Sequence, residues 1–242
     1  MAAIVTGASG GIGRAAALEL ARAGFAVALH YRKNGDVAEK LRAEISGMGA
    51  KAVCVRADLR TEAGAEALIA ETLKAFGSVD ALVNNAGISR VSPLSDISEA
   101  ELREVFETNF YSAFFCCKHA ARSMRAGRGG SIVNVASVWG ESGASCESHY
   151  AASKAALINL TKSLAKELGT SNIRVNCVSP GVIDTHMNDW LLPAHREDLC
   201  QRTPLGRIGS PADVAAAIAY LCSPAAAYLT GQILGVNGGF GL

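Results

Sequence analysis

Tyr150 and Lys154 are the two residues whose types and spacing most clearly suggest chemistry in this sequence. They stand in the run Tyr-Ala-Ala-Ser-Lys, so on a helix they lie one turn apart on the same face. A free tyrosine has a pKa of about 10, and lowering it to about 7 requires roughly 4 kcal/mol. A lysine ammonium about 4 Å away supplies roughly that free energy at an effective dielectric constant of about 20. The pair therefore predicts a tyrosine that exchanges a proton with a substrate, whereas the adjacent His149 should point in a different direction.

A third polar side chain, Ser137, follows Ser131 to Ala136, a run typical of a buried strand. A hydroxyl in this place can hydrogen-bond a substrate carbonyl and, with Tyr150, stabilise the alkoxide that develops on it. A Tyr-x-x-x-Lys pair alone occurs by chance on many exposed helices. The serine at a strand end favours proton transfer to a carbonyl oxygen as the interpretation.

A glycine-rich loop, Thr6 to Gly13, directly follows the first strand-like run and leads into a helical pattern. Glycines at Gly7, Gly11 and Gly13 permit a tight turn and let the backbone approach a pyrophosphate, which then lies at the positive end of the helix. The alternative is an ordinary glycine-rich turn. The position between a strand and a helix favours a dinucleotide-binding loop.

The end of the second strand indicates which dinucleotide would bind. The sequence there reads His-Tyr-Arg-Lys-Asn from His30 to Asn34, with no acidic residue to bind ribose hydroxyls. Arg32 is placed to pair with a 2′-phosphate through charge-assisted hydrogen bonds. NADP(H) is therefore favoured over NAD(H), and the alternative for Arg32 and Lys33 is a pair of solvated loop charges.

Short apolar runs alternate with longer helical patterns along almost the whole chain, which predicts an α/β fold. Strands are expected at Ala2 to Thr6, Ala26 to His30, Ala52 to Arg56, Ala81 to Asn84, Ser131 to Ala136, Arg174 to Ser179 and Gln232 to Val236, and helices at Gly13 to Ala23, Val37 to Met48, Thr61 to Phe76, Glu99 to Arg125, Tyr150 to Leu168 and Pro211 to Leu221. This pattern predicts one Rossmann-type, doubly wound domain over residues 1–242, a seven-stranded parallel sheet with helices on both faces. The segment Val182 to Pro204 fits no regular element and is expected to form a flap near the substrate.

The glycine spacing, the serine, tyrosine and lysine, and the ending Tyr228 to Gly239 resemble short-chain dehydrogenases/reductases, most closely the 3-oxoacyl-acyl-carrier-protein reductases. The resemblance covers essentially the whole chain. It implies reduction of a ketone to a secondary alcohol, with hydride from NADPH and a proton from Tyr150. It also implies that Asn109 anchors a water in a proton relay to Lys154, that Lys154 holds the nicotinamide ribose, and that the protein forms a homotetramer.

The resemblance further implies a set of cofactor contacts. Asp58 matches the family residue that contacts adenine, and Thr185 is the expected partner of the nicotinamide carboxamide. The complete set expected to bind the cofactor is Thr6, Gly7, Ser9, Gly11, Ile12, Gly13, Tyr31, Arg32, Asp58, Leu59, Asn85, Ala86, Gly87, Tyr150, Lys154, Pro180, Gly181, Ile183 and Thr185.

The segment between Ser137 and Tyr150 should border the substrate, and it carries Trp139, Glu141 and Glu147. This stretch is similar to a subgroup that reduces a 5-aminopentanone modification on elongation factor P, where either glutamate could pair with the substrate ammonium. The alternative is that both glutamates are exposed loop charges.

A substrate on acyl carrier protein would instead favour a basic docking surface. Arg122, Arg125 and Arg128 could supply one, or could form only a solvated helix end.

The composition narrows the possible partners. The formal net charge is +1, so no overall field attracts nucleic acid or a membrane surface. The seven cysteines form no Cys-x-x-Cys pair, so we expect neither a metal site nor disulfides, and we expect a cytoplasmic protein without a secretion signal. The small side chains Ala151, Ala152, Ala155 and Ala156 could pack against a partner helix. A non-catalytic NADP(H)-sensing protein of the same fold is the alternative from another class.

Overall fold

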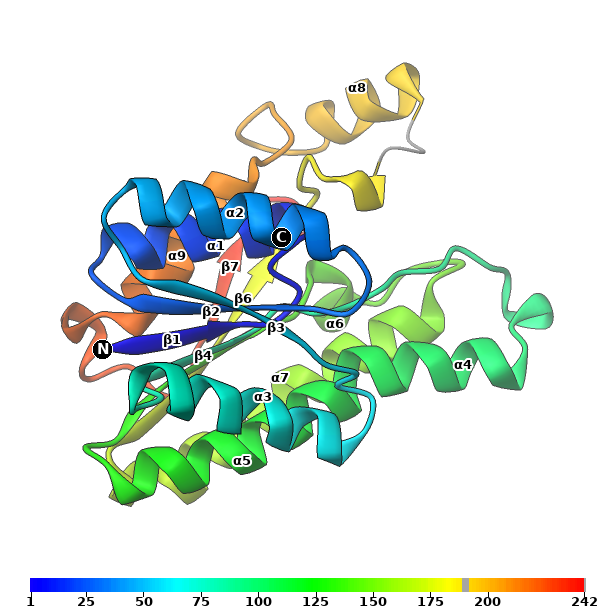
Figure 1. The fold of residues 1–242 in the computed structure, drawn as a ribbon. Coiled ribbons are helices and arrows are strands. Elements are labelled where there is room, and N and C mark those ends of the chain that lie inside the picture. Colours follow the sequence, from blue (N-terminus) through cyan, green and yellow to red (C-terminus); the bar gives the residue numbers. More distant parts are fainter. Residues whose placement is uncertain (189–191, 242) are drawn as a thin grey trace.

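The computed structural model describes residues 1–188 and 192–241, and a parallel sheet forms its centre (Figure 1). Its strands are β1 (Ala2–Val5), β2 (Ala26–Tyr31), β3 (Ala52–Arg56), β4 (Ala81–Asn84), β5 (Gly130–Val135), β6 (Ile173–Pro180) and β7 (Ile233–Val236). Their spatial order is β3-β2-β1-β4-β5-β6-β7, and all neighbours pair in parallel. The predicted seven-stranded, doubly wound α/β fold is confirmed.

Helices cover both faces of this sheet (Figure 1). The described helices are α1 (Gly11–Arg22), α2 (Gly35–Gly47), α3 (Glu62–Phe76), α4 (Glu99–Phe106), α5 (Ser112–Ala126), α6 (Val138–Ser142), α7 (Ser148–Leu168), α8 (Pro193–Gln201) and α9 (Pro211–Cys222). In Figure 1, α1, α2 and α9 lie on one face, and α3, α5 and α7 lie on the other.

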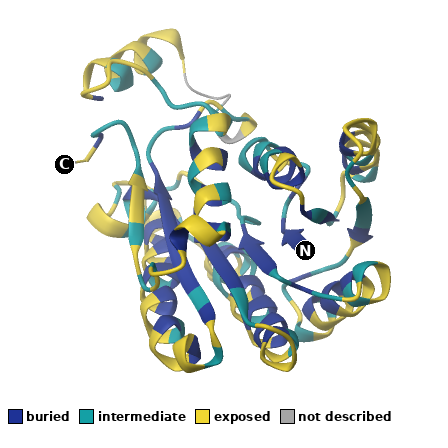
Figure 2. Ribbon diagram, turned by 90° about the vertical axis from the view of Figure 1, so that its left-hand side faces the viewer, coloured by how far each residue is buried: buried dark blue, intermediate teal, exposed yellow. Residues whose placement is uncertain are grey.

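Strand β1 shows why both faces need helices. Ala3 and Val5 pack into the core beneath α1 and α9, while Ile4 packs into the core beneath α3 and α5. Successive side chains of a strand point to opposite faces, so an all-apolar strand must be covered on both sides. Figure 2 shows the buried central strands between exposed outer helix faces.

The order of the strands reverses direction between β1 and β4, which are neighbours in the sheet although β2 and β3 lie between them in sequence. In open α/β sheets, crevices outside the carboxyl ends of the strands at such a point hold the ligand. The glycine-rich loop follows β1, and the loop that begins with Asn85 follows β4. The sheet therefore brings these two segments together at one edge.

Two predictions about local structure are corrected. The single helix expected at Glu99 to Arg125 is interrupted by a π-helical turn over Glu107–Tyr111. The segment Val182 to Pro204, expected to be irregular, contains a short 3-10 helix, His186–Asn188, and α8. Residues 189–191 of that segment lie outside the described residues. Elsewhere the predicted ends of the elements agree with the observed ones to within two residues.

No helix in the described ranges combines the length and the apolar character that crossing a membrane requires. Within the same ranges, no group of three or more His, Cys, Asp or Glu side chains could hold a metal ion.

Candidate active site

A cavity of about 250 Å³ opens beyond the carboxyl ends of the central strands, and Ser137, Tyr150 and Lys154 line it, whereas Asn109, the fourth predicted catalytic residue, does not. Ser137 comes from the end of β5, and Tyr150 and Lys154 come from α7. Trp139 and Glu147, two of the three predicted substrate residues, also line the cavity. The structure thus places residues from three separate segments around one space.

The third predicted substrate residue, Glu141, lies elsewhere. It is exposed on α6 and does not line this cavity. The two glutamates therefore differ in position: only Glu147 lies where it could contact a substrate bound beside Tyr150. One oxygen of the Glu147 carboxylate accepts a hydrogen bond of 2.5 Å from the Ser89 hydroxyl.

Ser137 is held where a strand turns into a helix. Its backbone is extended, and its Oγ caps α6 by accepting a hydrogen bond of 3.2 Å from the Trp139 amide. The Ser137 hydroxyl also lowers the pKa of Tyr150, and both side chains line the cavity. The serine hydroxyl therefore lies beside the residue with which it would share a substrate carbonyl oxygen.

Tyr150 is 8% exposed, and burial raises its pKa to about 12, against a lowering effect of the Ser137 hydroxyl and with a smaller rise from the Glu147 carboxylate. A buried phenol resists ionisation because the phenolate would lose its hydration. Tyr150 therefore holds its proton at neutral pH.

Lys154 is 4% exposed, and its Nζ donates a hydrogen bond of 2.8 Å to the Val135 carbonyl. The same Nζ lies 5.7 Å from the centre of the Tyr150 ring. Burial lowers the pKa of Lys154 to about 8, an effect that Cys177 partly opposes. The lysine is thus a buried cation on the same side of α7 as the tyrosine, as the spacing in the sequence predicted.

Asn109 is fully buried in the π-helical turn and connects two segments of the site. Its Nδ2 donates to the Ile88 carbonyl and to Ser153 Oγ, both at 2.9 Å, and its Oδ1 accepts from the Ile88 amide at 2.8 Å. Ser153 in turn donates to the Tyr150 carbonyl at 2.7 Å. Asn109 therefore contacts the catalytic helix through Ser153, a link that the sequence pattern did not suggest.

The glycine-rich loop has the shape that a pyrophosphate requires. A Cβ on Gly13 would lie 2.3 Å from the Gly7 carbonyl oxygen, and a Cβ on Gly11 would lie 2.8 Å from Thr185 Cγ2. Helix α1 begins at Gly11 without a side-chain cap, so its first amides remain available to an anion. The tight turn and the uncapped helix end fit the phosphates of a dinucleotide.

Two of the predicted cofactor residues tie this loop to the segment after β4. Thr6 Oγ accepts hydrogen bonds of 2.9 Å from the amides of Asn85 and Ala86. Asn85 Nδ2 donates to the carbonyls of Thr6 and Gly7 at 2.9 and 3.2 Å. These hydrogen bonds hold the loop on the side that faces the segment after β4, and they leave its other side available to a ligand.

A second cavity of about 290 Å³ lies beside the first and contains the other end of the predicted cofactor site. Residues of the glycine loop, of the β2 end and of the β3 end line it, among them Gly7, Ser9, Tyr31, Arg32, Asp58, Leu59, Ala86 and Gly87. The first cavity is lined by Ile12, Asn85, Gly87, Pro180, Gly181, Ile183 and Thr185 as well as by the catalytic residues. Gly87 borders both cavities, so one extended ligand could occupy them together.

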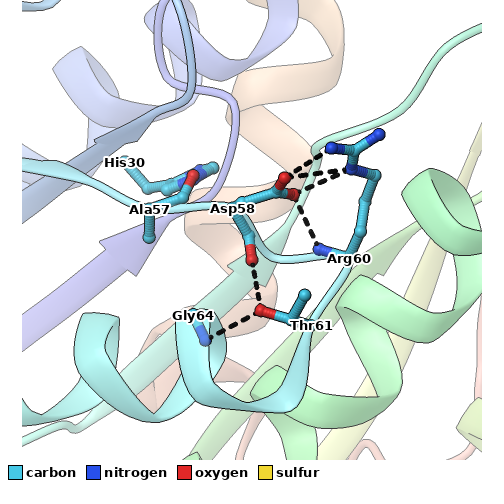
Figure 3. A network of polar contacts seen from close by, with 6 residues as sticks. All are labelled: His30, Ala57, Asp58, Arg60, Thr61 and Gly64. Carbon is cyan, nitrogen blue, oxygen red and sulfur yellow. Dashed lines mark hydrogen bonds and ion pairs between the residues drawn. The ribbon is translucent and has the colours of Figure 1, made fainter.

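Asp58 is held in place by a residue that the sequence pattern did not single out. Figure 3 shows the Arg60 guanidinium on the Asp58 carboxylate, with Nε 2.9 Å from Oδ1 and 3.1 Å from Oδ2. This hydrogen bonding lowers the pKa of Asp58 to about 2. Asp58 is therefore ionised and oriented at the rim of the second cavity.

The arginines considered for carrier-protein docking lie away from both cavities of their own chain. Arg122 and Arg125 are exposed on the last turns of α5, and Arg128 precedes β5, at the amino edge of the sheet. The active-site residues follow the carboxyl ends of the strands. Within one chain, these arginines cannot contact a group that is bound beside Tyr150.

His149 faces away from the reacting groups, as predicted from its helical position. It is buried, and its Nε2 lies 3.1 Å from Glu101 Oε1 on α4. Glu101 also accepts a hydrogen bond of 3.0 Å from Ser92 Oγ. These contacts attach the first turn of α7 to the segment after β4.

Comparison with known proteins places this architecture in a family. A family model described as enoyl-(acyl carrier protein) reductase matches residues 7–241. The chain is 41% identical over 237 residues to the 3-oxoacyl-[acyl-carrier-protein] reductase FabG of Staphylococcus aureus (strain Mu50), covering 98% of this chain and 96% of the relative. It is 40% identical over 239 residues to the uncharacterized oxidoreductase YmfI of Bacillus subtilis (strain 168), covering 98% of both chains.

A solved structure supports the same family assignment. A crystal structure from Sinorhizobium meliloti 1021, described as a short-chain alcohol dehydrogenase, matches with a TM-score of 0.95 at 36% identity and covers 98% of this chain and 95% of the other. The fold and the site define an oxidoreductase of the nicotinamide-dependent kind. This chain belongs to the short-chain dehydrogenase/reductase family.

Proposed function

We propose that this protein reduces a ketone to a secondary alcohol with NADPH. The observation that carries the proposal is one cavity lined by Ser137, Tyr150 and Lys154, in which Lys154 lies one turn further along α7 with its Nζ 5.7 Å from the centre of the Tyr150 ring. When bound, NADPH supplies the hydride that reaches the carbonyl carbon. Ser137 then holds the carbonyl oxygen, and Tyr150 donates the proton that completes the alcohol.

The preference for NADP(H) over NAD(H) rests on the second cavity. Arg32 and Lys33 line it at the end of β2, where an acidic residue would repel a 2′-phosphate. Arg32 has the planar donor geometry that suits a phosphate. The roles of Asp58 toward adenine, of Thr185 toward the carboxamide and of Asn109 toward a relay water remain part of the proposal.

The substrate that the relatives favour is a 3-oxoacyl group on acyl carrier protein, because the FabG relative is named for the reduction of that group. A second candidate is the 5-aminopentanone group on elongation factor P. The Glu147 carboxylate favours it, because this group lines the cavity and could pair with an ammonium on the substrate. A non-catalytic NADP(H) sensor is disfavoured, since a sensor has no need of the serine, tyrosine and lysine together.

We further propose that the chain acts as one domain, in the cytoplasm, as a homotetramer. Ala152 and Ala155 are exposed on α7 and could pack against a partner helix, whereas Ala151 is buried within its own chain and could not. Light scattering tests the assembly, and a stable monomer would contradict it.

Substitution of Tyr150 by Phe tests the reaction. Tyr150→Phe should lose at least about a thousandfold in the rate of ketone reduction, because no other side chain in the proposal donates the proton. NADPH should still bind, as measured by fluorescence titration. Tyr220→Phe is the matched control, since Tyr220 is exposed on α9. Turnover of Tyr150→Phe at the control rate would reject this mechanism.

Substitution of Glu147 by Gln distinguishes the two substrates. We expect Glu147→Gln to lower turnover of aminopentanone-bearing elongation factor P by about tenfold or more, because an ion pair is lost. Turnover of acetoacetyl-acyl-carrier protein should change little. Glu141→Gln is the control, because Glu141 is exposed outside the cavity. Wild-type protein that turns over only the carrier-bound ketone would eliminate the aminoketone candidate.

A further inference from the structure

His30 is a buried polar residue at the end of β2 for which the proposed reaction has no use. It is 4% exposed, and both of its ring nitrogens have partners. The Gly7 amide donates a hydrogen bond of 3.1 Å to Nδ1, and Nε2 lies 3.1 Å from the Ala57 carbonyl oxygen. Figure 3 shows the imidazole beside Ala57, next to the Asp58 and Arg60 pair.

These two partners determine the protonation of the ring. A carbonyl oxygen can only accept, so Nε2 must carry a proton, and an amide can only donate, so Nδ1 must be bare. The imidazole is therefore neutral and in a single tautomer. Burial agrees with this assignment, because it lowers the pKa of His30 to about 4, against a raising effect of Asp58 and together with a lowering effect of Arg32.

The first bond made by the imidazole orients the peptide at the start of the glycine loop. Gly7 has φ +63°, a conformation that glycine adopts without strain, and its carbonyl accepts from Asn85 Nδ2 and from the Gly10 amide. The Gly7 amide, in turn, donates its hydrogen bond to Nδ1 of His30. The His30 carbonyl also accepts a hydrogen bond of 2.9 Å from the Ala8 amide. Side chain and backbone of His30 thus both hold the first half of the loop.

The second bond of the ring holds the other wall of the same cavity. Ala57 directly precedes Asp58, and both line the second cavity together with Gly7 and His30. One rigid ring therefore spans from the loop after β1 to the segment after β3. A spacing error between these walls would alter the place where the adenosine half of a dinucleotide binds.

We propose that His30 is a positioning residue that sets the spacing between the glycine loop and the Asp58 segment, and thereby the affinity for the adenosine half of NADP(H). This inference rests on the proposed NADP(H) site. The imidazole touches neither the reacting atoms nor the nicotinamide side of the site, because it lines only the second cavity. Its effect should therefore fall on cofactor affinity and leave the catalytic step unchanged.

Two amide substitutions separate the two hydrogen bonds. Asn at position 30 can place an acceptor near the position of Nδ1 and keep the bond from Gly7, whereas Gln can place a donor near the position of Nε2 and keep the bond to Ala57. We expect His30→Asn to bind NADPH and 2′,5′-ADP about tenfold more weakly than wild type, because it loses the bond to Ala57. We expect His30→Gln to show a similar loss relative to wild type, because it loses the bond from Gly7 and each variant therefore breaks the bridge.

The control is His119→Asn, which removes a buried histidine that contacts Glu62 on α3, away from the loop. KM for NADPH should follow the dissociation constants, and kcat should be retained in both His30 variants. Wild-type affinity in either His30 variant, or a fall in kcat at unchanged affinity, would overturn the inference.

A second measurement keeps the inference testable if the variants fold poorly. Nitrogen-15 NMR of the wild-type histidines should show His30 as a neutral ring protonated at Nε2 at neutral pH, and a ring protonated at Nδ1 would refute it. Failure of wild-type protein to bind NADPH at all would instead contradict the proposed function, so the two failures are distinguishable.

Discussion

Replacement of Lys154 by methionine should stabilise the fold while it removes activity. Burial lowers the pKa of Lys154 from 10.5 to about 8. At ~1.36 kcal/mol per pKa unit, this difference corresponds to about 3 kcal/mol, the cost of holding an ammonium in the folded interior at neutral pH. Methionine fills a similar volume without charge, and the lost hydrogen bond to Val135 costs about 1 kcal/mol. The net gain is about 2 kcal/mol, or about 4 to 8 °C in melting temperature for a chain of this length.

The pH dependence of this gain follows from the same pKa values. At pH values below about 8, Lys154 is charged in both states, and only the folded state holds the charge away from water. Between about pH 8 and pH 10.5 the unfolded chain keeps the proton that the folded chain has lost, so wild-type stability rises with pH. The stability difference between Lys154→Met and wild type should therefore be largest at neutral pH and shrink toward pH 10.5.

Urea unfolding of cofactor-free protein at neutral and alkaline pH measures this difference. Lys162→Met is the matched control, because Lys162 is exposed on the same helix and its replacement should change stability by at most about 0.5 kcal/mol. Ketone reduction by Lys154→Met should fall by orders of magnitude. A Lys154→Met protein that is less stable than wild type at neutral pH, or a gain that persists unchanged at high pH, would refute the reasoning.

Three further predictions test other parts of the structure. Gly13→Ala should weaken NADPH binding by at least about tenfold in titration calorimetry, since its Cβ would lie 2.3 Å from the Gly7 oxygen, whereas Gly47→Ala should bind normally because no atom lies within 4 Å there. Arg32→Glu should raise KM for NADPH about tenfold or more and lower KM for NADH. An unchanged ratio of the KM for NADPH to the KM for NADH would contradict the proposed 2′-phosphate site. His30 has a pKa of 6.5 in the unfolded chain and of about 4 in the folded chain, so between these pH values only the unfolded chain takes up the proton. As the pH drops through this range, the free energy of unfolding of wild type should therefore fall by about 3 kcal/mol relative to that of His30→Asn. Unfolding free energies of the two proteins that change with pH in the same way would contradict this prediction.

The fold could be predicted from the sequence because the buried strands and their helices carry strong, separate patterns. Ala52 to Arg56 and Ala81 to Asn84 were predicted with their observed bounds, since each is a short apolar run between polar turns. The π-helical turn over Glu107–Tyr111 could not be predicted, because one inserted residue leaves the apolar pattern on both sides nearly intact. Helices as short as Val138–Ser142 are similarly too brief to show a period.

Only those residues of the site that belong to local sequence motifs could be predicted. Ser137, Tyr150 and Lys154 were identified because strand ends and helical spacing place side chains without knowledge of their distant partners. Val135 as the acceptor for Lys154 depends on how α7 packs on β5, which no local pattern records. The bridge made by His30 likewise joins residues far apart in sequence, and its signal is only a histidine in an otherwise apolar strand.

Burial acts on Tyr150 and Lys154 in a way that bears on the direction of the reaction. It raises the pKa of the tyrosine to about 12 and lowers that of the lysine to about 8, so each charged form is disfavoured. The sequence predicted that Lys154 lowers the pKa of Tyr150 to about 7, whereas in the folded chain burial outweighs the effect of the lysine, whose Nζ lies 5.7 Å from the ring centre. The tyrosine therefore remains a phenol at neutral pH beside a charged lysine, a state that can donate a proton to an alkoxide. Alcohol oxidation would need the phenolate first, so the pair as folded is better prepared for ketone reduction.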